Sequence, residues 1–287
     1  MTRRRPLRSA TADEMLTTLG RLTDRVRQGA ERQKARVELA EALQRSMLPA
    51  CLPTVPGLRV AAAYAPARNG LDIGGDWYDG FTLPDGSLGF SIGDVQGHDV
   101  EAAAFMGQVR IGLRAVATAT PDPGEVLRRA NELLLSVDHG LFATCSFLRY
   151  HPATGELESA RAGHVPAVWA TAGGYGGIVE DEGGVPLGIL PGEQYPVQRR
   201  RLADGGAFVL LTDGVVEGPS YTLEAGLEAV TRLVHSSVQQ GVDAGELAAQ
   251  VMEAAALTEH TDDAAVLVLL HDPVEAAAAA PYASDIG

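Results

Sequence analysis

The pattern of apolar and polar positions divides the chain into a helical N-terminal segment and a longer body of mixed elements. Residues 13–48 contain no proline, and apolar side chains such as Leu19 and Val26 fall on the a and d positions of a heptad repeat. Gly29 and Arg36 interrupt the middle of this seam. An interrupted heptad predicts a helical arm that dimerises or receives a partner, or else a solvated linker helix.

The segment LPACLPTVPG, which follows this helix, contains three prolines and a glycine and marks a domain boundary. The sequence therefore predicts a helical arm or linker over residues 1–51 and a folded body over residues 52–272. Residues 273–287 are rich in alanine and are expected to form a disordered tail.

Within the body, strand-like and helix-like patterns occur in groups. Strands are predicted over 58–67, 76–83, 88–95, 142–150, 155–163, 166–171, 205–214 and 264–270, and helices over 100–119, 124–138 and, as a pair, 222–257. The second and third strands should form a hairpin, and 142–171 should form a three-stranded meander. Such grouping favours an α+β fold, a sandwich of antiparallel sheets with paired helices, over a doubly wound parallel sheet.

Charge is distributed unevenly along the chain. Residues 1–45 contain 11 Arg or Lys against 6 Asp or Glu, and the whole chain carries −14, which leaves −19 on residues 46–287. So acidic a body should repel nucleic acid. Lys34 is the only lysine and lies in the arm, so the body has neither a Walker A lysine nor a Schiff-base lysine.

Other sequence signals exclude several classes of protein. The chain has no apolar run of the roughly 18 residues that a membrane helix needs, and its first ten residues do not resemble a signal peptide. We therefore expect a cytoplasmic protein without a membrane partner. Cys51 and Cys145 are the only cysteines and lie in unlike surroundings, which supports neither a disulfide framework nor a thiolate zinc site.

Aspartates recur where apolar segments meet turns, at Asp76, Asp94, Asp213 and Asp262. If these four carboxylates converge, they repel one another strongly unless cations lie between them. An all-oxygen ligand set selects magnesium or manganese, and two such ions can activate water for hydrolysis of a phosphate ester. The alternative is that each aspartate simply caps a glycine-containing turn.

Six motifs carry a resemblance to a known family. In chain order they are GGDWYDG, GDVQGHD followed by EAAAFM, RAGHVPAVW, GGVPLGIL, FVLLTDGVVE and TDDAAVLVLL. Together they resemble the bacterial metal-dependent Ser/Thr protein phosphatases of the PPM superfamily, in the branch of the stage II sporulation phosphatase and the RsbU-like regulators. The resemblance covers about residues 43–271.

The resemblance implies a β-sandwich of two antiparallel sheets flanked by helices, with two manganese or magnesium ions at one end. By motif, Asp94 would bridge both ions and Asp76 would hold the second. Asp213 and Asp262 would hold the first, and the backbone carbonyl of Val95 would complete that shell. The implied substrate is phosphoserine or phosphothreonine on a small anti-sigma-factor antagonist of the STAS type.

Several positions near these motifs leave alternatives open. Asp263 matches a polar position beside a ligand and ranks second to Asp262. Most relatives have glycine where this chain has Asp99, which either caps the following helix or adds a carboxylate near the metals. His98 is a candidate general acid for the leaving serine oxygen, or it only holds its loop. His164 and Arg68, a possible phosphate ligand, are weaker candidates.

The sequence leaves two alternative functions open. GFSIG, residues 89–93, matches the nucleophile elbow of α/β-hydrolases, with Ser91 as nucleophile and Asp213 and a later histidine as partners. The elbow needs a sharp turn at the serine, but the apolar pattern continues past Ser91, which predicts a position within a strand. The second rival is a phosphatase-fold domain that binds a phosphoprotein without hydrolysing it.

Overall fold

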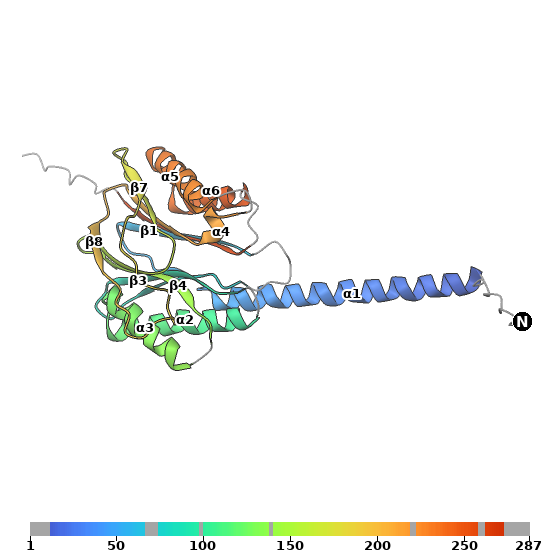
Figure 1. Cartoon of the computed structure of the whole chain (residues 1–287). Helices are drawn as coiled ribbons and strands as arrows, with labels where there is room; N and C mark the ends of the chain where they lie inside the picture. The colour runs from blue at the N-terminus through green and yellow to red at the C-terminus, as the bar shows by residue number, and fades with distance from the viewer. Residues whose placement is uncertain are drawn as a thin grey trace, which may run out of the picture.

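The computed structural model describes residues 12–66, 74–97, 100–137, 140–218, 222–257 and 262–272. Two antiparallel sheets stack face to face, helices cover both outer faces, and a long N-terminal helix projects from the body (Figure 1). The predicted α+β sandwich with paired helices is confirmed.

Each sheet has five strands. The first, here called the β1 sheet, has the order β1-β10-β9-β6-β7, with β1 (Leu58–Ala65), β6 (Val168–Ala170), β7 (Gly176–Ile178), β9 (Ala207–Leu211) and β10 (Ala264–His271). The second, the β3 sheet, has the order β2-β3-β4-β5-β8, with β2 (Trp77–Thr82), β3 (Leu88–Val95), β4 (Ala143–His151), β5 (Glu156–Ala162) and β8 (Gln198–Arg201). All pairs of neighbouring strands are antiparallel.

Alternation along the strands separates the sandwich interior from the helix-covered faces. In β10, Ala265, Leu267 and Leu269 point between the sheets, whereas Val266 and Val268 belong to the cluster under the helices. Side chains two residues apart share a face of a strand, so one strand contributes to both clusters. Both faces of β10 are therefore buried, as the unbroken apolar run predicts.

Helices pack in two groups. On the β3 sheet lie α2 (Val100–Ala119) and α3 (Pro123–Val137), and on the β1 sheet lie α4 (Asp213–Val216), α5 (Leu223–Gln239) and α6 (Ala244–Leu257). The sandwich is thus four layers thick, helix, sheet, sheet, helix. None of the helices in the described ranges combines the length and hydropathy of a membrane-spanning segment.

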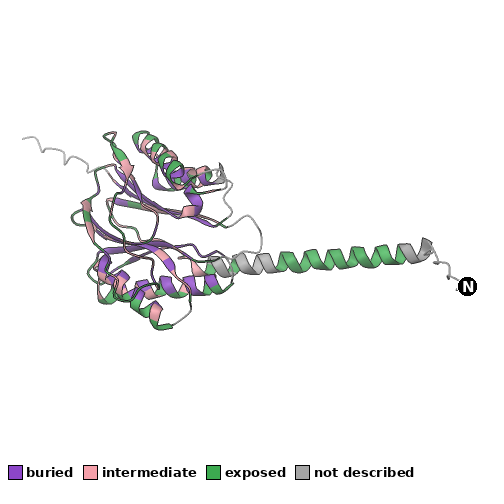
Figure 2. Ribbon diagram, viewed as in Figure 1, coloured by how far each residue is buried: buried purple, intermediate pink, exposed green. Residues whose placement is uncertain are grey.

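The N-terminal helix α1 (Ala12–Met47) extends away from the sandwich. Figure 2 shows most of the described part of this helix as exposed. Leu19, Leu22 and Val26 are 60%, 53% and 71% exposed. Its C-terminal end contacts α2, where the Met47 side chain packs against the buried cluster of the β3 sheet. The predicted helix is confirmed, and the seam positions described in its first half are open to solvent.

The predicted meander is wrong in its third strand. Strands β4 and β5 pair as expected, but β6 pairs with β9 in the opposite sheet. The chain leaves the β3 sheet at Gly163, whose φ of +64° lies in the left-handed region that glycine adopts readily. The short elements α4, β7 and β8 had no prediction, because three or four residues show no clear period. Residues 273–287 lie outside the described ranges, and the predicted domain boundary stays a prediction.

Candidate metal centre

The hairpin of the β3 sheet brings Asp76 and Asp94 together. Asp76 directly precedes β2, and the β2–β3 register pairs Trp77 with Gly93, which sets Asp76 opposite Asp94. On its other side Asp94 pairs with Thr144 of β4. Two carboxylates from the GGD and GDV motifs therefore share one end of this sheet.

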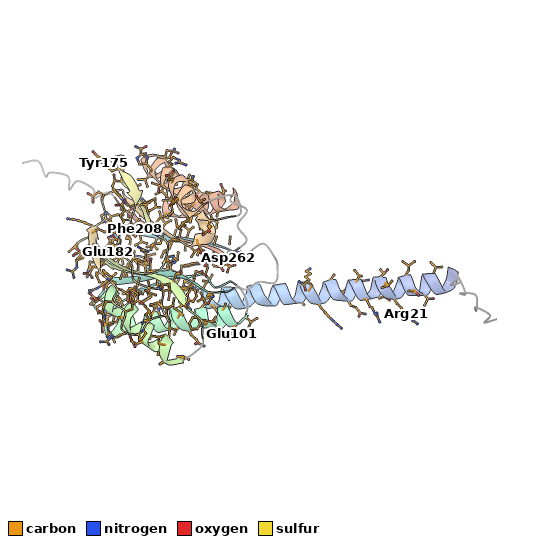
Figure 3. The ribbon with its side chains drawn as sticks, in the orientation of Figure 1. Arg21, Glu101, Tyr175, Glu182, Phe208 and Asp262 are labelled. Carbon is orange, nitrogen blue, oxygen red and sulfur yellow. The ribbon has the colours of Figure 1, made fainter. Side chains whose placement is uncertain are left out.

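The β1 sheet brings a second group of aspartates to the same end. Asp213 begins α4 and is separated from the end of β9 by one residue, and Asp262 and Asp263 directly precede β10. The antiparallel register of β9 and β10 sets the end of β9 beside the start of β10. Figure 3 shows Asp262 at this end of the sandwich, on the side where α1 projects, and Tyr175 and Glu182 at the opposite end.

A buried hydrogen bond joins the two groups. The Thr212 hydroxyl, between β9 and α4, donates to Oδ2 of Asp76 at 2.7 Å. Both residues are almost fully buried. The carboxylates of the two sheets therefore belong to one site rather than to separate surfaces.

The aspartates of this site act strongly on one another. Burial, followed by the charges of Asp94, Asp263 and Asp213, raises the pKa of Asp76 well above its usual value. Burial, followed by the charges of Asp213 and Asp262, raises the pKa of Asp94 to about 8. Burial and then Asp262 raise the pKa of Asp213. When the carboxylates of this cluster are ionised, their burial and mutual repulsion destabilise the fold. A divalent cation among them would offset that destabilisation.

Two glycines let the loop before β2 pack closely against this site. A Cβ atom on Gly74 would lie 0.7 Å from Oδ2 of Asp263. A Cβ atom on Gly75 would lie 2.4 Å from the backbone carbonyl oxygen of Val95 and 3.0 Å from Oδ1 of Asp94. A side chain at either position would collide with these oxygen atoms, so both residues must be glycine. The Val95 carbonyl faces the same loop.

Asp262 and Asp263 differ in environment. Asp262 is exposed, and its Oδ1 accepts a hydrogen bond from the Asp263 backbone N–H at 2.8 Å. Asp263 is 1% exposed and accepts a hydrogen bond from the Tyr64 hydroxyl at 2.7 Å. Burial and the neighbouring aspartates raise the pKa of Tyr64, which keeps this hydroxyl a donor. Asp262 therefore faces solvent, and Asp263 lies at the floor of the site.

The donor atoms of these side chains are suited to a cation, but the side chains do not converge on a single point. Among the described residues, no group of three or more His, Cys, Asp or Glu side chains is arranged to hold a metal ion. Coulombic effects on pKa act over about 4–6 Å, whereas metal–oxygen bonds are about 2.0–2.6 Å long. The carboxylates therefore lie close enough to affect one another's pKa, and they would have to turn inwards to bind a cation. The donors are all oxygen, as magnesium and manganese prefer.

The remaining predicted residues are placed only in part. His98, Asp99 and Arg68 lie outside the described residues, so their predicted roles stay predictions. His164 is 3% exposed, and its Nδ1 lies 2.9 Å from the Thr144 hydroxyl. Burial lowers the pKa of His164 to about 3, so its ring is neutral near pH 7. A neutral, enclosed imidazole supports a structural role for His164.

The geometry of Ser91 argues against the hydrolase rival. Ser91 lies within β3, pairs with Asp79 on one side and Phe147 on the other, and is 0% exposed. Its Oγ accepts a hydrogen bond from Nε1 of Trp77 at 3.2 Å. A nucleophile elbow needs an exposed serine on a turn, so Ser91 is a core residue.

Sequence reasoning missed two residues of this site, Thr212 and Tyr64. The only local signal for Thr212 is its place in TDG, directly before a predicted ligand. Tyr64 gives no local signal, because its partner Asp263 is 199 residues further along the chain.

Comparisons with known proteins identify relatives that match most of the folded body. The family model described as stage II sporulation protein E (SpoIIE) matches residues 84–272. This span includes Asp94, Asp213 and Asp262 and begins after Asp76. The crystal structure of the RsbU and RsbW domains of Rv1364c from Mycobacterium tuberculosis aligns with a TM-score of 0.69 and 31% identity, covering 80% of this chain and 64% of that chain.

Two curated relatives extend the comparison. Protein IcfG of Synechocystis sp. is 27% identical over an alignment of 233 residues that covers 71% of this chain and 36% of the relative. Phosphoserine phosphatase RsbU of Bacillus subtilis is 26% identical over 185 residues, which are 64% of this chain and 54% of the relative. The chain thus spans less than two thirds of the length of either relative. Since the family model covers most of the sandwich, the chain belongs to the stage II sporulation protein E family.

Proposed function

We propose that this chain is a metal-dependent protein phosphatase that hydrolyses phosphoserine or phosphothreonine on a regulatory protein. The observation that carries this proposal is the buried cluster of aspartates from both sheets, where burial and then the charges of the neighbouring aspartates raise the pKa of Asp76 and Asp94. A relative that aligns with 64% of the chain is named a phosphoserine phosphatase, which supports the same reaction.

The proposed cofactors are two divalent cations, manganese or magnesium. Asp94 would contribute to both ions, Asp76 to the second, and Asp213, Asp262 and the Val95 carbonyl to the first. When bound, such ions neutralise phosphate charge and make water a stronger nucleophile near neutral pH. Their carboxylate ligands come from both sheets, so the sandwich itself would set the spacing between the ions.

The chain's own residues would then position the substrate and move a proton. His98 follows Asp94 by four residues in the sequence, and we propose that its ring donates a proton to the leaving serine oxygen. Histidine suits this role at neutral pH, because the ordinary pKa of its side chain is about 6.5. Asp99, next to it, would cap α2.

The proposed substrate is a phosphorylated anti-sigma-factor antagonist of the STAS type. Support comes from the resemblance of the motifs to the RsbU-like branch and from the alignment with the RsbU and RsbW domains of Rv1364c. The chain would then act in a switch that controls a sigma factor.

The reaction is tested by phosphate release from p-nitrophenyl phosphate and from a phosphoserine peptide. We expect manganese to stimulate release and excess chelator to abolish it. Ser91→Ala should retain activity within about threefold, because Ser91 is a buried strand residue. Release that ignores both manganese and chelator would contradict the proposal, and absence of release under all conditions would favour a phosphoprotein-binding module.

We also propose that α1 mediates a homodimer or binds an activator. Leu19, Leu22 and Val26 are exposed on one helical seam, and exposed apolar seams of this kind pair with another helix. Replacing Leu19 and Leu22 by Asp in the full chain should convert a dimer to a monomer in sedimentation analysis or abolish activation by the partner. Unchanged mass and unchanged activity would contradict this role.

A further inference from the structure

Thr212 provides a hydrogen bond that links the aspartates of the two sheets. It follows β9 of the β1 sheet, and its acceptor Asp76 precedes β2 of the β3 sheet, 136 residues away in sequence. Thr212 is 0% exposed and Asp76 is 2% exposed, so no bulk water competes for this hydrogen bond.

The neighbouring backbone favours the Thr212 hydroxyl as the donor of this hydrogen bond. The N–H of Ala265 donates to Oγ1 of Thr212 at 2.8 Å, so a lone pair of the hydroxyl is already used. The single hydroxyl proton can reach Oδ2 of Asp76 at 2.7 Å or the Ala265 carbonyl at 3.5 Å. The shorter contact favours Asp76 as the acceptor.

The backbone also holds Thr212 itself in place. Its N–H donates to the Ala265 carbonyl at 3.0 Å, which continues the β9–β10 ladder by one residue. The hydroxyl therefore projects from a paired backbone rather than from a free loop. Asp213, the next residue, begins α4, so the orientation of Thr212 is coupled to that of a second predicted ligand.

We propose that Thr212 is a positioning residue for divalent cations, which orients Asp76 through its hydroxyl group. The hydroxyl donates to Oδ2 of Asp76, which fixes the orientation of that carboxyl group. Because Thr212 belongs to a paired backbone, the same hydrogen bond holds Asp76 at a fixed distance from the β1 sheet. This inference rests on the proposed function, because it concerns the same metal centre.

The test compares two replacements of Thr212 by calorimetric titration of manganese into the full chain. Thr212→Val keeps the shape and removes the hydroxyl, and we expect it to weaken manganese binding at least tenfold. Thr212→Ser keeps the hydroxyl and loses only a methyl group, and its affinity should remain within threefold of the wild type. Thr231→Val is the matched control, because the Thr231 hydroxyl donates to the Leu227 carbonyl within α5, away from the carboxylates.

Three outcomes of this titration would overturn the inference. Manganese affinity of Thr212→Val within twofold of the wild type overturns the inference and leaves the proposed function standing. Lost affinity in Thr212→Ser also overturns it, and this comparison holds even if the valine variant does not fold. A wild-type chain that binds no manganese overturns the inference and the proposed function together.

Discussion

Replacing Asp94 by Asn is expected to reduce manganese-dependent phosphate release by at least about 100-fold, which exceeds the usual effect of losing an outer-shell partner. Asp94 lies at the end of β3, opposite Asp76, and is acted on by the charges of Asp213 and Asp262. We therefore propose that Asp94 is the aspartate that serves both ions. Asparagine keeps the size of the side chain but has no charge and only one oxygen to share.

The same variant should not be unstable without metal. The charge of Asp94 is the second-largest cause of the raised pKa of Asp76, after burial. Removing that charge relieves repulsion, so metal-free Asp94→Asn should melt at or above the wild-type temperature. Asp204→Asn, at an exposed site before β9, is the control and should keep full activity. Asp94→Asn with more than a tenth of wild-type activity would contradict a bridging role.

Metal-free protein is expected to lose stability as the pH rises from 5 to 8. The pKa of Asp94 is raised from 3.8 to about 8, and the pKa of Asp76 is also raised. In this range the folded state binds more protons than the unfolded state, so the free energy of unfolding falls with increasing pH. Most globular proteins change little in this range, since their stability is highest there.

Manganese should reverse this pH dependence, because a bound cation takes the place of the protons and binds better as the carboxylates ionise. Calorimetric melting at pH 5, 6.5 and 8, in chelator and in manganese, measures both trends. In chelator, Asp94→Asn should show a weaker pH dependence than the wild type. A metal-free melting temperature that rises steadily from pH 5 to pH 8 would rule out the repulsive cluster.

The four aspartates of the candidate centre could be predicted from the sequence, because each has a recognisable local pattern around it. Asp76, Asp94, Asp213 and Asp262 each adjoin a strong apolar segment, and the hairpin around residues 84–86 fixed the relation of the first two. The relation between the two pairs depended on how the sheets stack. No local pattern encodes that contact, and only the resemblance to the family supplied it.

The second aspartate of GGDWYDG shows the limit of a motif. Asp79 is two residues from the end of the sheet and fully buried, and Arg110 of α2 donates to it at 3.1 Å. Burial raises the pKa of Asp79, and the arginines opposite it lower that pKa. This carboxylate therefore anchors α2 on the β3 sheet, although its sequence context resembles that of Asp76.

The contacts that sequence reasoning missed are long-range. Thr212 and Asp76 are 136 residues apart, and Tyr64 and Asp263 are 199 apart. Strand β6 changed sheets for a similar reason, since three residues match either sheet and only packing selects one. Short elements and cross-sheet hydrogen bonds are set by tertiary packing, which outweighs local propensity.

We propose that aspartates from two sheets surround divalent cations at one end of the sandwich. Crystals grown with manganese and measured at its absorption edge would reveal these ions. We expect two anomalous peaks within bonding distance of Asp94, with Asp76 at one and Asp213 and Asp262 at the other. Ordered side chains of these four residues with no anomalous peak among them would contradict it.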